Sequence, residues 1–254
     1  MSINLKNKVA IVTGSNQGIG EDIARIFAEN GANVVINGHR DKEALKKLAE
    51  SISNDTGAQI KPVLADVTKR KDGQKLVDAA KELGGVDILV NNAGGLIERV
   101  PVAEFDEEHF QKVMDVNTMG AFLMSSLVLP EMKKKGSGKI INLSSQAAHD
   151  GGGGGAAAYA ASKGAVWTFT KSLCKEVASD GITVNAISPG FILNTKFHDT
   201  FTPSDIQKKV VEKIPLGRSG EARDVAKVAL FLASNLSDYM TGESIQVNGG
   251  LFLH

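Results

Sequence analysis

Tyr159 and Lys163 are the residues whose types and spacing most directly suggest proton-transfer chemistry. They stand four positions apart with neither glycine nor proline between them, so on a helix they share one face, about 6 Å apart along the axis. A tyrosine hydroxyl is a poor acid or base at neutral pH, and a nearby ammonium stabilises its phenolate form. Such a pair is common and usually means a partly buried ring beside a solvated amine, so other features must support the chemistry.

A glycine-rich turn follows the apolar run Val9–Thr13 and reads Gly14-Ser15-Asn16-Gln17-Gly18-Ile19-Gly20. Backbone N–H groups and the positive end of the next helix favour a pyrophosphate at such a turn. Glycines allow close approach of the phosphates and backbone angles with positive φ. The spacing differs from the usual Gly-x-Gly-x-x-Gly, but the position after the first predicted strand indicates a nucleotide site.

The residues after the second predicted strand, Asn37-Gly38-His39-Arg40, bear on the choice of dinucleotide. An acid at this place accepts a hydrogen bond from the adenosine 2′-hydroxyl, whereas a basic group pairs with a 2′-phosphate. No acid occupies it, and the Arg40 guanidinium suits a phosphate. The sequence therefore favours NADP(H) modestly over NAD(H); the alternative is a solvated Arg40 next to a capping Asp41.

The elements that must position these residues alternate between short apolar runs and longer segments of helical period. We predict an α/β fold for residues 1–254: a single-domain doubly wound Rossmann fold, with a seven-stranded parallel sheet flanked by helices. The predicted strands are Val9–Thr13, Asn33–Asn37, Lys61–Ala65, Val86–Asn91, Lys139–Leu143, Ile182–Ile187 and Ser244–Val247. The predicted helices are Gly20–Glu29, Lys42–Ser53, Gly73–Leu83, Glu107–Lys134, Tyr159–Ser179, Ser204–Glu212 and Glu221–Leu232.

This arrangement brings the reactive residues together. The glycine turn, the segment Asn91-Asn92-Ala93-Gly94, Ser144-Ser145 and the Tyr159 pair all lie at or just after the carboxyl ends of predicted parallel strands. That edge is where open α/β sheets bind their ligands. Of the two serines we select Ser145, because Ser144 should point to the opposite side of the strand end.

With these features together, the sequence resembles the short-chain dehydrogenase/reductase family from Lys8 to Gly250. The matching residues are Thr13–Gly20, Asp66-Val67, Asn91–Gly94, Asn117, Ser145, Tyr159-Ala160-Ala161-Ser162-Lys163, Pro189-Gly190 and Val247-Asn248-Gly249-Gly250. The resemblance implies a nicotinamide dinucleotide and four catalytic residues. Tyr159 would exchange a proton with the substrate oxygen, Ser145 would orient that oxygen, Lys163 would bind the ribose and lower the tyrosine pKa, and Asn117 would hold a water.

The resemblance and the turn together give a set of expected cofactor-binding residues. They are Gly14, Ser15, Asn16, Gln17, Gly18, Ile19, Gly20, Gly38, His39, Arg40, Asp66, Val67, Asn91, Ala93, Gly94, Tyr159, Lys163, Pro189, Gly190, Ile192 and Thr195. Asp66 could instead be a helix cap.

Two loops, His149–Ala158 and Phe191–Thr202, should frame the substrate pocket. Both are rich in small or polar residues, which favours a small hydroxylated or carboxylated substrate over a steroid. Phe191, Phe197 and Phe201 argue the other way, since they could line an apolar channel or pack the loop. The glycine-rich segment and the Phe197-His198 pair are similar to those of reductases of sugar acids, such as 4-deoxy-5-hexoseulose uronate. The expected substrate-binding residues are Ser145, Gln146, His149, Tyr159 and His198, with Arg99, His149 or His198 holding a carboxylate.

The main alternative is a 3-oxoacyl-carrier-protein reductase, to which the whole chain is also similar. Docking of the carrier would need a basic patch at the pocket mouth, for which Arg99 or Lys133–Lys135 are candidates. An alternative of another class is a non-catalytic nucleotide sensor or scaffold on the same fold. A sensor has no need of the proton-transfer residues.

Composition narrows the partners and the setting. Lys plus Arg and Asp plus Glu are both 29, giving zero formal charge, so nucleic acid is not an expected partner. Cys174 is the single cysteine, which fits a reducing compartment and leaves no Cys-rich metal site. We predict no metal, no membrane association and a cytoplasmic protein. The resemblance implies a homo-oligomer, a dimer or a tetramer.

Overall fold

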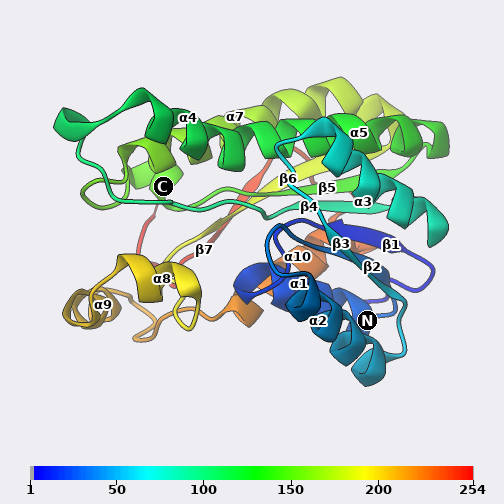
Figure 1. The fold of residues 1–254 in the computed structure, drawn as a ribbon, viewed down its shortest axis with the longest axis horizontal. Coiled ribbons are helices and arrows are strands. Elements are labelled where there is room, and N and C mark those ends of the chain that lie inside the picture. The colour runs from blue at the N-terminus through cyan, green and yellow to red at the C-terminus, as the bar shows by residue number, and fades with distance from the viewer. Residues whose placement is uncertain (1–2, 254) are drawn as a thin grey trace.

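The computed structural model describes residues 3–253 and is built around a parallel β-sheet (Figure 1). The strands are β1 (Val9–Val12), β2 (Asn33–Gly38), β3 (Ile60–Leu64), β4 (Ile88–Asn91), β5 (Gly138–Leu143), β6 (Ile182–Pro189) and β7 (Ser244–Val247). They run in the order β3-β2-β1-β4-β5-β6-β7, and every neighbouring pair is parallel. The predicted doubly wound fold is confirmed.

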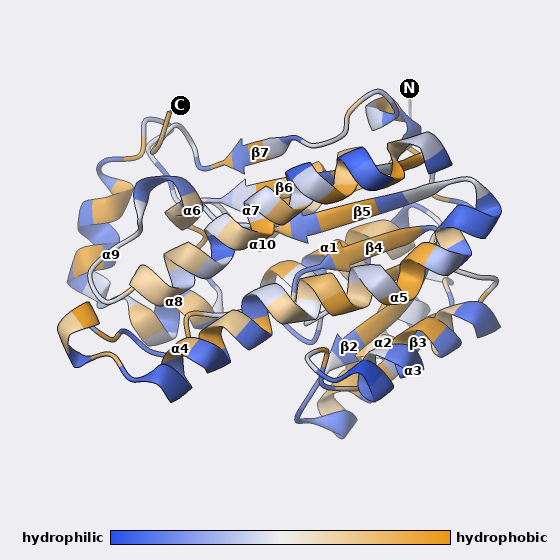
Figure 2. Cartoon of the chain, turned by 90° about the horizontal axis from the view of Figure 1, so that it is seen from above, coloured by the Kyte–Doolittle hydropathy of each residue, from blue (hydrophilic) through white to orange (hydrophobic). Residues whose placement is uncertain are grey.

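Helices cover both faces of the sheet because its central strands are apolar on both sides. One face packs against α1 (Gly18–Glu29), α2 (Lys42–Thr56) and α10 (Ala222–Ala233). The other packs against α3 (Arg70–Glu82), α5 (Gly120–Lys135) and α7 (Ala157–Val177). Figure 2 shows the strands largely in the orange of apolar residues and much of α3 in blue.

The strand order sets the position of the site. After β3 the chain returns to the middle of the sheet, so β4 pairs with β1 on the side opposite β2. Connections leaving β1 and β4 therefore diverge to opposite faces, and a crevice opens between them at the carboxyl ends.

All seven predicted strands and all seven predicted helices are present, with ends shifted by a few residues. The predicted helix Glu107–Lys134 is interrupted: α4 (Glu107–Met114) and α5 are joined by a π-helical turn, Asp115–Met119. Two short helices, α6 (Ala147–Asp150) and α8 (Lys196–Phe201), lie in the segments expected as loops, and α8 is followed by α9 (Ser204–Val211).

One helical stretch, Glu107–Lys135, is long and apolar enough by length and composition to cross a membrane. That is weak evidence, because the core helix of a globular fold meets the same test. In this structure 44% of its most apolar window is buried, and α5 contributes Met124, Val128 and Met132 to the core against the sheet.

Candidate functional site

A cleft of about 1270 Å³ runs along the carboxyl ends of the strands. It begins at the glycine turn after β1, passes the ends of β4 and β5, and finishes under α8 and α9. Most of the predicted site residues line it. Those of the cofactor set are Gly14, Asn16, Gln17, Gly18, Ile19, Gly20, Gly38, His39, Arg40, Asp66, Val67, Ala93, Gly94, Tyr159, Lys163, Pro189, Gly190, Ile192 and Thr195.

The glycine turn fits a diphosphate because its backbone is open and closely packed. Gly14 and Gly18 both have φ of +60°, in the left-handed region that favours glycine. A Cβ on Gly14 would lie 2.8 Å from Ala93 Cα, so a side chain there would push β1 and β4 apart. Helix α1 starts at Gly18, which directs its positive end at the cleft.

Ser15 belongs to the turn, but its side chain does not line the cleft. Its hydroxyl donates to Val12 O at 2.7 Å and accepts from Asn37 N at 2.9 Å. The side chain is fully buried. Ser15 therefore ties the turn to β2, because it satisfies backbone groups that the turn leaves unpaired.

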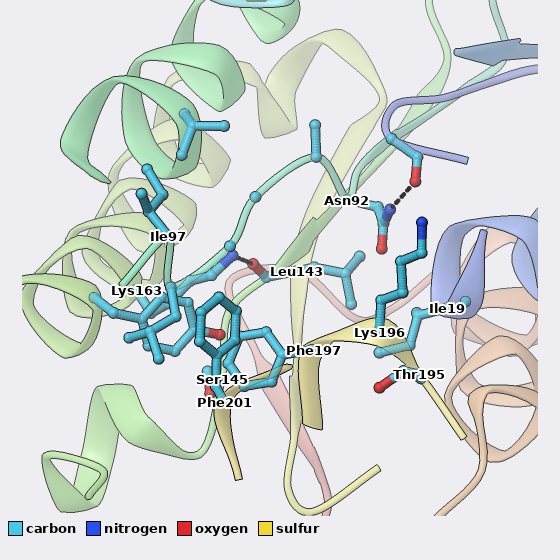
Figure 3. Close-up of a pocket in the computed structure, with 18 of the residues that line it drawn as sticks. Ile19, Asn92, Ile97, Leu143, Ser145, Lys163, Thr195, Lys196, Phe197 and Phe201 are labelled. Atoms are coloured by element: carbon cyan, nitrogen blue, oxygen red, sulfur yellow. Dashed lines mark hydrogen bonds between the residues drawn. The ribbon is translucent and has the colours of Figure 1, made fainter. Parts of the chain in front are cut away.

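Ser145, Tyr159 and Lys163 all line the cleft, and Figure 3 shows Ser145 and Lys163 near its middle. The Ser145 hydroxyl is hydrogen-bonded to the Tyr159 hydroxyl and accepts from Ala147 N at 3.2 Å. Lys163 Nζ lies 5.8 Å from the centroid of the Tyr159 ring and donates to Leu143 O at 2.7 Å. Ser144 points the other way, as expected, and donates to Lys163 O at 3.0 Å.

Burial controls the charges of this group. It raises the pKa of Tyr159 above its ordinary value, and the Ser145 hydrogen bond only partly opposes that shift. Burial also lowers the pKa of Lys163 to about 8. The resemblance implied a lowered tyrosine pKa, and in this structure the direction is the reverse, because desolvation disfavours the phenolate. Tyr159 therefore holds its proton at neutral pH, as a proton donor must.

Asn117 lies behind Lys163, in the π-helical turn. It is buried; its Nδ2 donates to Gly95 O at 2.8 Å and to Val113 O at 2.9 Å, and its Oδ1 accepts from Gly95 N at 3.0 Å. A Cβ on Gly94 would lie 2.5 Å from Asn117 Oδ1 and 3.1 Å from Lys163 Nζ. Gly94 thus lets the amide and the ammonium approach each other, and a second lone pair of Oδ1 is available for the expected water.

The Asn91 side chain faces the interior and does not line the cleft. Its Nδ2 donates to Asn142 Oδ1 on β5 at 2.8 Å and to Ser125 Oγ on α5 at 3.1 Å. The cleft is lined instead by Asn92, whose Nδ2 donates to the carbonyl oxygens of Thr13 and Gly14, both at 2.9 Å. Neighbouring strand residues point to opposite sides, and that alternation is the signal that could have distinguished them.

The polar residues at the adenosine end of the cleft fit both interpretations given by the sequence, contact with the cofactor and capping of a helix. Arg40 lines it and is exposed, while Asp41 accepts from Ala44 N at 2.9 Å and so caps α2. Asp66 also lines the cleft and accepts from Thr68 Oγ1 at 2.7 Å. Although burial opposes the shift, the hydrogen bonds from Thr68 lower the pKa of Asp66.

The substrate end contains Gln146 and His198 but not His149. His149 is turned away, with Nε2 3.3 Å from Ser188 Oγ and its ring 5.8 Å from that of Phe252. Burial lowers the pKa of His198 to about 4, and the nearby Arg99 charge adds to this. His198 is therefore a neutral imidazole at pH 7, and neither histidine supplies a cation for a carboxylate.

Arg99 connects two walls of the cleft. Its Nε donates to Phe201 O at the end of α8, at 3.0 Å, and its Nη1 donates to Gly154 O at 2.8 Å. The glycine segment is held further by Val100 N, which donates to Gly155 O at 3.0 Å. These contacts place the segment 151–155 against the loop that follows β4.

Apolar side chains form the wall that faces Tyr159. The Phe197 ring lies 5.7 Å from the Tyr159 ring, centroid to centroid, and Figure 3 shows Phe197 beside Phe201 and Ser145. Of the two roles that the sequence left open for Phe197 and Phe201, lining an apolar channel or packing the loop, the structure places both residues in the lining of the cleft. Helices α8 and α9 and the loop after β4 bring together side chains that are distant in sequence. The apolar lining residues contributed by these segments and by the C-terminal end are Leu96, Ile97, Phe197, Phe201, Ile206, Val210 and Leu251.

Comparisons with known proteins give the family. Residues 14–252 match a family model described as Enoyl-(Acyl carrier protein) reductase. The chain is 39% identical over 257 residues to 3-oxoacyl-[acyl-carrier-protein] reductase FabG of Aquifex aeolicus, covering 99% of this chain and 100% of that one. It is 40% identical over 252 residues to a 3alpha-hydroxysteroid dehydrogenase of Mediterraneibacter gnavus, covering 98% of both.

A solved structure agrees. A protein of Sinorhizobium meliloti described as a short-chain alcohol dehydrogenase has a TM-score of 0.89 and 34% sequence identity, with 98% of this chain and 97% of that one covered. The chain belongs to the short-chain dehydrogenase/reductase family. It is an NAD(P)-dependent oxidoreductase that acts on CH–OH groups.

Proposed function

We propose that this protein uses NADPH to reduce the 3-oxo group of an acyl thioester. The observation that carries the proposal is the apolar wall opposite Ser145 and Tyr159, built from Phe197, Phe201 and Ile97. An acyl chain gains free energy by leaving water against such a wall, whereas a hydroxylated sugar does not. The relatives named 3-oxoacyl-[acyl-carrier-protein] reductase support the same class, and Arg40 supports NADPH.

The reaction follows from the positions of the side chains. A nicotinamide dinucleotide bound along the glycine turn would supply the hydride that the carbonyl carbon receives. Ser145 and Tyr159 donate hydrogen bonds to the carbonyl oxygen, which stabilise the negative charge that develops there. Tyr159 then gives its proton to that oxygen, completing the alcohol. Lys163 and Asn117 lie behind Tyr159. At that position a proton can return to the tyrosine after it has donated its own.

A second candidate is the sugar-derived oxo acid, supported by two polar groups. Gln146 Oε1 is buried and accepts no hydrogen bond from residues 3–253, so a hydroxyl of a bound molecule could donate to it. Arg99 Nη2 likewise has no hydrogen-bond partner in that part of the chain, and could pair with a carboxylate.

The run Lys133–Lys135 does not help a carrier protein to dock, because Lys133 and Lys135 pair with Asp180 and Asp87, away from the cleft.

An assay that follows absorbance at 340 nm tests the proposal. NADPH and NADH are each mixed with the protein and an acetoacetyl thioester, a sugar-derived oxo acid, a neutral sugar or a 3-oxosteroid. We expect the thioester to give the highest kcat/KM, and NADPH to be preferred to NADH. Turnover of the oxo acid alone would refute the thioester assignment and establish the second candidate; a preference for the steroid would refute both.

We also propose that the protein forms a homo-oligomer through α5 and α7. Phe122 and Met119 are about half exposed, and the Phe122 ring stacks on that of Phe169 with centroids 3.7 Å apart. Exposed apolar clusters of this kind mark contact surfaces. We expect light scattering to give the mass of a dimer or tetramer, and Phe122→Glu to reduce it while Val102→Glu, at another exposed position, does not. A monomeric wild-type protein at micromolar concentration contradicts the proposal.

A further inference from the structure

Lys196 is a cation of the cleft with no role in the mechanism above. It is the first residue of α8 and lines the cleft. Figure 3 shows its side chain extending along the cleft towards the side on which Asn92 and Ile19 lie. The residue before it, Thr195, packs on the glycine turn: its Cγ2 is 3.7 Å from the position that a Cβ on Gly18 would take. The Lys196 side chain therefore begins directly beside the glycine turn.

The turn itself supplies no charged side chain. Gly14–Gly20 contains neither lysine nor arginine, so a diphosphate there would meet only backbone N–H groups and the end of α1. A diphosphate carries two negative charges, and the N-terminus of one helix, equivalent to roughly half a positive charge, balances them only in part. An additional cation at this point would lower the free energy of the bound anion.

The other cations that line the cleft come from other parts of it. Arg40 lies at the adenosine end, Lys112 belongs to α4, Arg99 donates through Nε and Nη1 to the carbonyls of Phe201 and Gly154, and Lys163 donates to Leu143 O. Lys196 forms no ion pair or hydrogen bond through its ammonium with any residue from 3 to 253. The nearest acid along its helix, Asp199, is three residues on and forms no ion pair with it.

We propose that the Lys196 ammonium binds the diphosphate of the dinucleotide. The inference rests on the cofactor site of the proposed function and adds a residue to it. The same ion pair fixes the start of α8, the helix that carries Phe197 and Phe201. Binding of the dinucleotide thus positions the apolar wall over Tyr159, which makes the cofactor a determinant of the substrate pocket.

Binding measurements with Lys196→Met test the proposal without turnover. Kd is measured for NADPH and NADH by nucleotide fluorescence, and for ADP-ribose, which has the diphosphate but no nicotinamide, by calorimetry. We expect roughly tenfold weaker binding of all three at low salt, the size of one partly exposed charge-assisted contact. The difference should shrink as salt is raised, because salt screens the pair. Lys196→Arg should retain most of the affinity.

Two matched variants separate the explanations. Lys208→Met removes the same charge from α9, where Lys208 lies outside this cleft, and should leave all three Kd values unchanged. Arg40→Ala should weaken NADPH only. A loss confined to NADPH in Lys196→Met would assign the lysine to the 2′-phosphate, and unchanged Kd values for all three ligands would overturn the proposal. A wild-type protein that binds NADPH but reduces no thioester contradicts the proposed substrate and leaves this test intact.

Discussion

Tyr159→Phe is expected to abolish turnover and leave dinucleotide binding nearly intact. The substitution removes one oxygen and keeps the ring against Phe197, so the shape of the pocket is preserved. Without the hydroxyl, no proton reaches the substrate oxygen, and loss of a general acid typically costs about 10²–10⁴ in rate. The measurement is kcat with the best substrate of the panel, together with Kd for NADPH. The chain's other tyrosine, Tyr239, is fully exposed, so Tyr239→Phe is the matched control.

Unchanged turnover in Tyr159→Phe would refute the mechanism. The pH dependence gives a second check. Because burial raises the pKa of Tyr159 above 10.0, the tyrosine is protonated throughout the neutral range and is ready to act in reduction. Oxidation of the alcohol needs the phenolate instead, so its rate should increase with pH.

Lys163→Met is expected to lose activity and gain stability at pH 7. Lys163 is 4% exposed, and burial lowers the pKa of its ammonium from 10.5 to about 8 in the folded chain. Between those values the unfolded chain binds the proton more tightly, so stability increases with pH from about 8 to 10.5, and below 8 the full cost is present. That cost is roughly 3 kcal/mol, offset by about 1–2 kcal/mol for the lost hydrogen bond to Leu143 O.

Chemical denaturation at fixed protein concentration measures the difference in stability between the variant and the wild type, and the change of that difference with pH. Lys163→Met should be about 1–2 kcal/mol more stable than wild type at pH 7, with the advantage declining as the pH rises above 8, and kcat should fall at least about 100-fold with the loss of the charge behind Tyr159. Lys175→Met, at an exposed position of the same helix, should change neither quantity much. A folded Lys163→Met protein that is less stable than wild type at pH 7 would show that the buried charge is compensated.

The fold and the centre of the site could be predicted because they depend on local patterns. Short apolar runs specify buried parallel strands, and the spacing of Tyr159 and Lys163 places both on one helix face. The glycine turn is similarly local, since positive φ at Gly14 and Gly18 is a property of single positions. The sequence therefore contained the reacting pair, the turn and the edge of the sheet where they meet.

The remaining errors concern side-chain direction and distant packing. Asn91 and His149 have the chemistry of site residues, but their partners, Asn142 and Ser188, are remote in sequence. The sequence left open whether Phe197 and Phe201 line an apolar channel or pack the loop, because their position depends on how α8 folds over the cleft. Periodicity also cannot identify α8, whose six residues are fewer than two turns.

The glycine segment held by Arg99 has a consequence for conformational entropy. Gly151, Gly152 and Gly155 have positive φ, whereas Gly154 has neither an unusual φ nor any neighbour within 4 Å of a Cβ. An alanine would fit at Gly154 and would restrict the open loop more than glycine does. The chain thus keeps, at Gly154, the conformational freedom of a glycine that the closed geometry does not require. Conformational freedom of this kind suits a loop that must open to release the product as well as close over the substrate.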